Sequence, residues 1–391
     1  MNFKTIADIS WKGKSALVRV DFNVPYDTIT GEIADDRRIA SSIPTIEFLR
    51  THGAKVILCT HLGRPGGEYN DGLHLTKIAE KLSHMLDFPV EYVHDAVGEL
   101  AQKRAALMSE GEILMLENIR FYPGEEANTS SFASSLASLA DVFVNDAFGT
   151  AHRAHASTEG ITHYIPSVAG FLMEKELQML SLALENPKRP LSAIVGGAKI
   201  NDKIAILGRL MAKADTIMVG GGMVASFIST IKGELPKNEM EQFCSNLMAE
   251  SGTNSASLIL PKDVVVSKGL TRSSHATVPI DGIPDGWSIA DIGPATVDLF
   301  RRHLESSETI IWNGPMGIFE IPEFASGTVS VAEFLSASHG TTIIGGGSTG
   351  EAVEKLGLSD RMAHVSTGGG ASLEFLEGRI LPGVAALENP S

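Results

Sequence analysis

Five arginines in the first half of the chain follow short apolar runs or, in the case of Arg38, open the helix after the first loop. They are Arg19, Arg38, Arg64, Arg120 and Arg153. Such runs predict strands of a parallel sheet, and ligands bind these sheets beyond the carboxyl ends of the strands. A guanidinium group carries a fork of donors that matches carboxylate and phosphate oxygens. Any one of these arginines alone is better explained by a surface ion pair, but all five together predict a site for a multiply charged anion.

The second half of the chain carries glycine at the same places. Glycine-rich segments follow five apolar runs, at 196–197, 220–222, 314–317, 345–350 and 368–370. Backbone without side chains lets a base, a ribose and phosphates lie close, and a helix N-terminus adds favourable positive charge. Lys199 and Lys203 follow the first of these segments. This pattern favours a nucleotide with a phosphate tail.

Two phosphate-binding motifs match only in part. Gly345, Gly347 and Gly350 fit G-x-G-x-x-G, but 364–367, about 20 positions later, lacks the acid that binds the ribose of a dinucleotide. Gly13-Lys14-Ser15 has the tail of a P-loop, but Asp8 replaces its first glycine and the segment precedes a strand. Neither motif is complete.

The histidines and cysteines do not form a metal motif. His152 with His155, or Cys59 with His61, supplies fewer than the three or four ligands of a zinc site. We therefore interpret His61 as a residue that binds the anion, the others as structural, and we predict no metal ion held directly by the protein.

The elements that position these residues alternate along the chain. Apolar runs predict strands at 15–20, 55–59, 90–93, 113–116, 142–145, 191–195, 216–219, 257–260, 309–312, 341–344 and 363–365. Helical spacing lies between them, for example at 39–49, 75–86, 100–108 and 132–139. The alternation predicts an α/β fold of two open, Rossmann-like parallel-sheet domains, each with three layers. We place the first domain at 1–170, a connector helix at 171–186, and the second domain at 187–378.

Composition limits the possible partners. The chain has 391 residues and a net charge of −15, which argues against general binding of nucleic acid or anionic membrane. It has two cysteines, far apart in sequence, and no apolar run of about 18 residues that could span a bilayer. We expect a cytoplasmic protein.

These motifs together resemble those of phosphoglycerate kinase along essentially the whole chain. The substrate-side segments are 19–25, 36–39, 61–65, 116–126 and 145–157; the connector is 168–177; the nucleotide-side segments are 196–203, 220–222, 312–320, 345–349 and 364–374. The resemblance implies reversible phosphoryl transfer between ATP and the carboxylate of 3-phosphoglycerate, giving 1,3-bisphosphoglycerate and ADP. It also implies that Mg²⁺ enters with the nucleotide, that the protein is a monomer, and that 379–391 returns to the first domain.

The resemblance assigns roles to particular residues. Those implied to bind phosphoglycerate are Asp21, Phe22, Asn23, Arg38, His61, Leu62, Gly63, Arg64, Arg120 and Arg153. Those implied to bind the nucleotide are Lys203, Gly221, Gly222, Glu320, Gly346, Gly347, Ser348 and Thr349. Those implied to act in catalysis are Arg38, Lys199, Lys203, Gly369 and Gly370. A carboxylate nucleophile is already ionised near neutral pH, so we expect charge neutralisation and domain closure over a cleft, without a general base.

Ser348 departs from the family pattern. The family usually has Asp at this position, where it helps to bind the Mg²⁺ of the nucleotide, and a hydroxyl is a weaker ligand for this ion. Two alternatives therefore remain open. One is a nucleotide- or phosphoglycerate-binding homologue with weakened activity, and the other is a two-domain NAD-dependent dehydrogenase.

Overall fold

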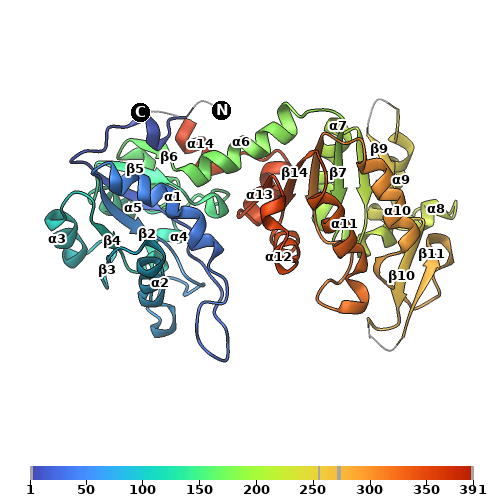
Figure 1. Cartoon of the computed structure of the whole chain (residues 1–391), viewed down its shortest axis with the longest axis horizontal. Helices are drawn as coiled ribbons and strands as arrows, with labels where there is room; N and C mark the ends of the chain where they lie inside the picture. The colour runs from blue at the N-terminus through green and yellow to red at the C-terminus, as the bar shows by residue number, and fades with distance from the viewer. Residues whose placement is uncertain (1–2, 254–255, 271–273, 389–391) are drawn as a thin grey trace. The chain divides into compact units, whose positions relative to one another are not determined.

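The computed structural model describes residues 3–253, 256–270 and 274–388. The chain divides into two compact units, one running through Leu177 and resuming at Ile380, the other spanning Gln178–Arg379. The boundary falls inside helix α6 (Phe171–Glu185), which covers the predicted connector. In the last segment, α14 (Pro382–Glu388) lies beside β6 (Ser167–Ala169) of the first unit (Figure 1). The last three residues of the predicted segment 379–391 are outside the described residues.

The first unit is built on a six-stranded parallel sheet with the order β3-β4-β2-β1-β5-β6. Its other strands are β1 (Ser15–Arg19), β2 (Lys55–Cys59), β3 (Val90–Tyr92), β4 (Ile113–Met115) and β5 (Val142–Asn145). Alternate side chains face opposite layers: Val18 and Val56 join one buried apolar cluster, and Leu17 and Ile57 join another. Strands buried on both faces need helices on both sides, which explains the continuous apolar runs.

The register of this sheet brings the ends of its strands together. Arg19, the last residue of β1, pairs with Cys59 of β2 on one side and with Asn145 of β5 on the other. The loops after these strands therefore leave the sheet at the same level. The helices of this unit are α1 (Arg37–Thr51), α2 (Thr76–Leu86), α3 (Glu99–Leu107), α4 (Pro123–Glu126) and α5 (Ser130–Ala137).

The second unit has its own six-stranded parallel sheet, with the order β15-β14-β13-β7-β8-β9. The strands are β7 (Leu191–Val195), β8 (Thr216–Val219), β9 (Ser257–Ile259), β13 (Thr309–Asn313), β14 (Thr341–Gly345) and β15 (His364–Val365). Asn313 pairs with Val195 and Gly345, so three glycine-rich loops start at one level. The predicted fold class, two parallel-sheet α/β domains, is confirmed.

The helices of the second unit pack around this sheet. They are α7 (Ile204–Lys213), α8 (Ile228–Ile231), α9 (Glu239–Glu250), α10 (Pro294–Leu304), α11 (Ser326–Ser336), α12 (Gly347–Lys355) and α13 (Gly370–Leu376). Trp312 is buried in the apolar cluster that includes Phe300 of α10 and Val353 of α12. No helix among the described residues has the length and apolar character needed to cross a membrane.

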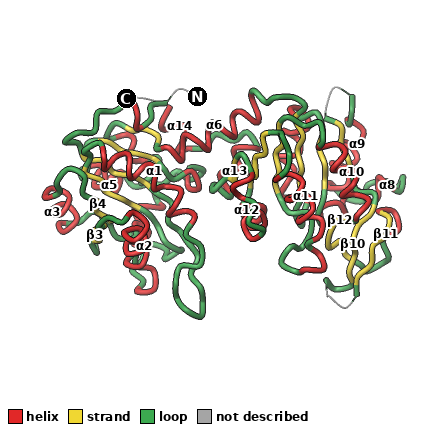
Figure 2. Tube along the Cα trace, viewed as in Figure 1, coloured by secondary structure: helices red, strands yellow, loops and turns green. Residues whose placement is uncertain are grey.

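The strand predictions missed four strands. One is β6, a three-residue strand in the stretch that we took for the domain junction. The others form a small antiparallel sheet of β10 (Asp263–Ser267), β11 (His275–Pro279) and β12 (Ser288–Ile292), visible in Figure 2. β11 alternates exposed and half-buried residues, so it lacks the continuous apolar run that marks the parallel strands.

Candidate active site

Four arginines of the first unit converge on His61. The imidazole follows β2 and is buried, and Arg19 Nη2 lies 3.1 Å from its Nδ1. Burial sets the pKa of His61 well below its ordinary value, and the positive charges of Arg19, Arg120, Arg38 and Arg153 lower it further. We call Arg19, Arg38, Arg120 and Arg153 the arginine cluster. His61 is therefore neutral at physiological pH and contributes hydrogen bonds rather than charge.

Hydrogen bonds join five of the predicted substrate residues into one chain. Arg38 Nη1 donates to Asp21 Oδ2 at 3.0 Å and to the Asn23 carbonyl at 3.1 Å. The Gly63 amide donates to Asn23 Oδ1 at 2.9 Å, and Arg120 Nη1 donates to the Gly63 carbonyl at 2.7 Å. Loops after β1, β2 and β4 are thus fixed against one another, with positive charge concentrated between them.

Burial also affects Arg120, which is almost fully enclosed. Burial lowers the pKa of Arg120, and the neighbouring Arg19 and Arg153 act in the same direction, whereas Glu126 opposes them. Arginines held this close repel one another, so the site favours an anion that neutralises them.

Glu125 and Ser157 support the cluster and were not among the predicted site residues. Arg19 Nε donates to Ser157 Oγ at 2.8 Å, and Ser157 Oγ donates to Glu125 Oε1 at 2.6 Å. The Ser157 amide donates to Glu125 Oε2 at 3.0 Å. Burial raises the pKa of Glu125, and the charge of Arg19 opposes that shift. Spacing along the chain gives no sign of this network, because Arg19 and Ser157 are 138 positions apart.

Three predicted substrate residues are placed differently from the others. The side chains of Phe22 and Leu62 are buried in the apolar core, and their amides already donate to Thr60 Oγ1 and Asn118 Oδ1. Both residues therefore contribute core packing and hydrogen bonds between loops. Arg64 is exposed, and within the described residues no hydrogen bond or ion pair links it to the arginine cluster.

The second unit gathers the predicted nucleotide residues at the carboxyl ends of its sheet. Lys203 Nζ donates to Asn313 Oδ1, and burial lowers the pKa of Lys203 while Asp202 and Glu377 oppose that shift. The Gly196 amide donates to the Asn313 carbonyl at 2.9 Å. Asn313, which was not predicted as a site residue, thus connects the loops after β7 and β13.

The loop after β14 turns directly into α12. Gly346 is the N-cap, with φ of 90°, and an added Cβ would lie 3.1 Å from Asn313 Nδ2. Gly347 and Ser348 are exposed in the first turn, where free amides and the helix dipole favour an anion. Thr349 is buried, and its Oγ1 accepts a hydrogen bond from the Gly314 amide at 2.7 Å. Its hydroxyl therefore joins two loops and does not face solvent.

The remaining nucleotide-side predictions lie in neighbouring loops. Gly221 packs tightly, since an added Cβ would meet the Gly197 carbonyl at 2.5 Å, and Gly222 begins the turn that follows. Lys199 and Glu320 are exposed, and no described hydrogen bond or ion pair ties them to Lys203. Gly370 begins α13, and Gly369 is its N-cap with φ of 50°.

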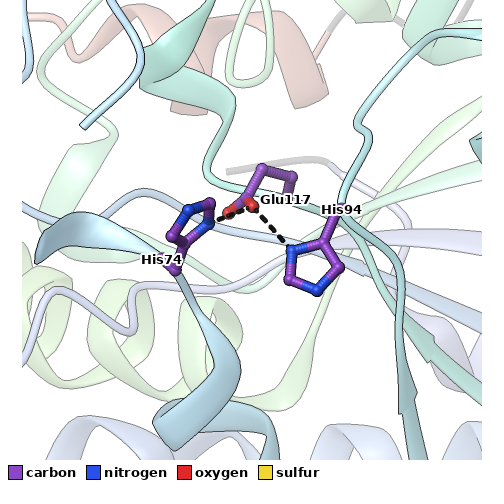
Figure 3. A group of neighbouring side chains, drawn as sticks. All are labelled: His74, His94 and Glu117. Atoms are coloured by element: carbon purple, nitrogen blue, oxygen red, sulfur yellow. Dashed lines mark hydrogen bonds and ion pairs between the residues drawn. The ribbon is translucent and has the colours of Figure 1, made fainter. Parts of the chain in front are cut away.

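The cysteines and histidines weighed as metal ligands do not form a site. Cys59 is fully buried, which raises the pKa of its thiol to about 12. Burial, followed by the charges of Arg120, Arg19 and Arg153, lowers the pKa of His155 to about 4. A different group, His74, His94 and Glu117, does bring three potential ligands together (Figure 3). No spacing in the sequence marks this group, because its members come from three separate loops.

Comparison with known proteins identifies the family. The family model described as phosphoglycerate kinase matches residues 6–379. The chain belongs to the phosphoglycerate kinase family. It is 49% identical to the phosphoglycerate kinase of Chloroflexus aggregans over the full length of both chains. It is 50% identical to that of Synechococcus elongatus, covering 98% of this chain and 97% of the relative.

Solved structures of phosphoglycerate kinases support the same family assignment. The structure from Coxiella burnetii matches with a TM-score of 0.87 and 38% identity, covering 99% of each chain. The structure from Pyrococcus horikoshii matches with a TM-score of 0.83 and 30% identity, covering 98% of each chain. The resemblance inferred from the motifs is confirmed. The dehydrogenase alternative is not favoured.

Proposed function

We propose that this chain transfers the γ-phosphoryl group of ATP to the carboxylate of 3-phosphoglycerate, giving 1,3-bisphosphoglycerate and ADP, and catalyses the reverse reaction. The observation that carries the proposal is the arginine cluster around a neutral His61 in a member of the phosphoglycerate kinase family. The acceptor bears a phosphate and a carboxylate, and a site with several converging guanidinium groups suits both.

The first unit supplies the acceptor site in this proposal. Arg120 and Arg153 bind the phosphate of 3-phosphoglycerate, while His61, Asn23 and Asp21 hydrogen-bond its polar groups. Arg64 lies on an exposed loop and contacts the bound ligand from there. Arg38 lies beside the acceptor carboxylate and neutralises charge that develops on the transferring phosphoryl group. No general base is needed, because the nucleophile is already a carboxylate.

The second unit supplies the nucleotide site. Lys203 and Lys199 contact the phosphates, and the amides of the α12 N-terminus bind them as a helix N-terminus binds other anions. Amides at Gly369 and Gly370 add donors to the moving group, and Glu320 binds the ribose. Mg²⁺ arrives with the nucleotide. Ser348 can offer it only a neutral hydroxyl, so we expect the nucleotide phosphates and water to hold most of its coordination shell.

Other properties follow from the family and the charge. A net charge of −15 supports a protein that binds neither nucleic acid nor anionic membrane. Family membership supports a monomeric cytoplasmic enzyme that works in glycolysis.

A coupled assay of ADP formation tests the proposal. We expect ADP release from Mg-ATP with 3-phosphoglycerate and almost none with glycerate, which lacks the phosphate that Arg120 and Arg153 bind. Ligand binding measured by calorimetry without ADP formation would support the inactive homologue instead. Equal rates with glycerate would refute the assigned role of the arginine cluster.

A further inference from the structure

His74, His94 and Glu117 form a compact group at the carboxyl edge of the first sheet. His94 follows β3, Glu117 follows β4, and His74 lies in the loop between β2 and α2. Their ligand atoms all lie within 4.8 Å of one another. His74 Nδ1 is 2.6 Å from Glu117 Oε2, and His94 Nδ1 is 3.6 Å from the same oxygen (Figure 3).

These distances are close to those around a bound metal ion. Zinc–ligand bonds of about 2.1 Å in a tetrahedron place neighbouring ligand atoms about 3.4 Å apart. His94 and Glu117 already meet this spacing. His74 and Glu117 need to separate by less than about 1 Å, with the proton between them released to water.

The surroundings orient these ligands. Tyr92 Oη donates to Glu117 Oε2 at 2.6 Å, and the Asn118 amide donates to Glu117 Oε1 at 2.7 Å. Tyr69 Oη lies 2.6 Å from His74 Nε2, the ring nitrogen that faces away from Glu117. Tyr69, on the far nitrogen of His74, and the Asn118 amide, on the free oxygen of Glu117, thus hold positions typical of the partners of metal ligands. Tyr92 donates to Oε2, the oxygen that would face the ion, and would share that oxygen with it.

The group is open to solvent on one side. Glu117 is only 4% exposed, whereas the His94 side chain is 65% exposed, so the group opens to solvent on the His94 side. An ion can enter there and keep water in its fourth position. Two imidazoles and one carboxylate suit a divalent transition metal ion better than Mg²⁺, which prefers oxygen ligands alone.

We propose that His74, His94 and Glu117 bind one divalent transition metal ion, with Zn²⁺ as the ion that best fits. The site is separate from the arginine cluster and needs no part of the phosphoryl-transfer proposal. Asn118 connects the two, because its side chain also holds the Leu62 amide and the Arg120 amide.

The test is a zinc titration of the full chain after treatment with a chelator, in competition with a chromogenic chelator. We expect one equivalent to bind, and the affinity to fall at least about tenfold in His94→Ala, since even loss of an outer-shell partner has that effect. His84→Ala is the matched control: this histidine is exposed at the end of α2 in the same unit, and its replacement should leave affinity unchanged. Excess Mg²⁺ should not compete.

Cobalt substitution gives a second readout. Co²⁺ bound by two nitrogens and one oxygen should give visible absorption bands that His94→Ala removes and His84→Ala retains. Because His94 is exposed, its replacement should leave the fold intact, and circular dichroism checks this. Absence of a one-equivalent site, or equal loss of affinity in both variants, would overturn the proposal.

Discussion

Replacing Arg38 by alanine should separate catalysis from stability. Arg38 Nη1 is 3.0 Å from Asp21 Oδ2, with 36% of the arginine side chain and 10% of the aspartate side chain exposed. The aspartate is buried and the arginine only partly exposed, so loss of the pair should cost roughly 1–3 kcal/mol of folding free energy. An arginine that stabilises charge on a transferring phosphoryl group contributes about 10³-fold or more to the rate, or about 4 kcal/mol of activation free energy.

The assay compares kcat, from the coupled release of ADP, with the midpoint of urea unfolding. We expect Arg38→Ala to lose at least about 10³ in kcat while unfolding still begins well above the urea-free conditions of the assay, so that the lost activity is not lost folding. Arg37→Ala is a matched control, because Arg37 is the preceding residue, is similarly exposed, and pairs with Asp35 outside the arginine cluster. It should retain a near-normal kcat.

Two results would refute this reasoning. One is a near-normal kcat for Arg38→Ala. The other is an equal loss in Arg38→Ala and Arg37→Ala, which would indicate a general disturbance of the start of α1 and no specific role in transfer.

Three further predictions follow from local structure. Ser348→Asp should lower the Mg²⁺ concentration needed for half-maximal rate, and an unchanged Mg²⁺ titration would show that this position does not contact the ion. Gly346→Ala should destabilise the second unit by about 1–3 kcal/mol because φ is 90°, and should raise KM for ATP but not for 3-phosphoglycerate; equal effects on both KM values would contradict it. Burial raises the pKa of Asp146 to about 7, so the folded state holds a proton that the unfolded chain loses near pH 4. The free energy of unfolding should therefore fall by up to about 4 kcal/mol between pH 4 and 7. Denaturant unfolding of Asp146→Asn, measured over the same pH range, should not show this fall.

Much of the fold was predictable because its parallel strands are buried on both faces. The runs 56–59 and 142–144 are apolar throughout, and the strands that contain them, 55–59 and 142–145, have the predicted bounds. The small sheet of β10, β11 and β12 was missed because polar or exposed positions shorten its apolar runs: β10 is bounded by Asp263 and Ser267, β11 alternates exposed and half-buried residues, and Asp291 interrupts β12.

The order and ends of the strands predicted where the site lies, but not which side chains contact one another there. Of the five predicted arginines, Arg19, Arg38, Arg120 and Arg153 lie close enough to lower the pKa of His61, whereas Arg64 is exposed outside the cluster. The burial of Phe22 and the network from Arg19 through Ser157 to Glu125 depend on side-chain packing between distant segments. Periodicity records which side of a strand a residue faces, but not its partner across the fold.

The most direct test is to identify the bond that the enzyme makes. Acyl phosphates react with hydroxylamine to give hydroxamates, whereas phosphate esters and free phosphate do not. With Mg-ATP, 3-phosphoglycerate and hydroxylamine, we predict one hydroxamate for each ADP formed, and neither product when 3-phosphoglycerate is omitted. ADP formed without hydroxamate would show that the phosphoryl group does not reach the carboxylate, and would contradict the proposed function.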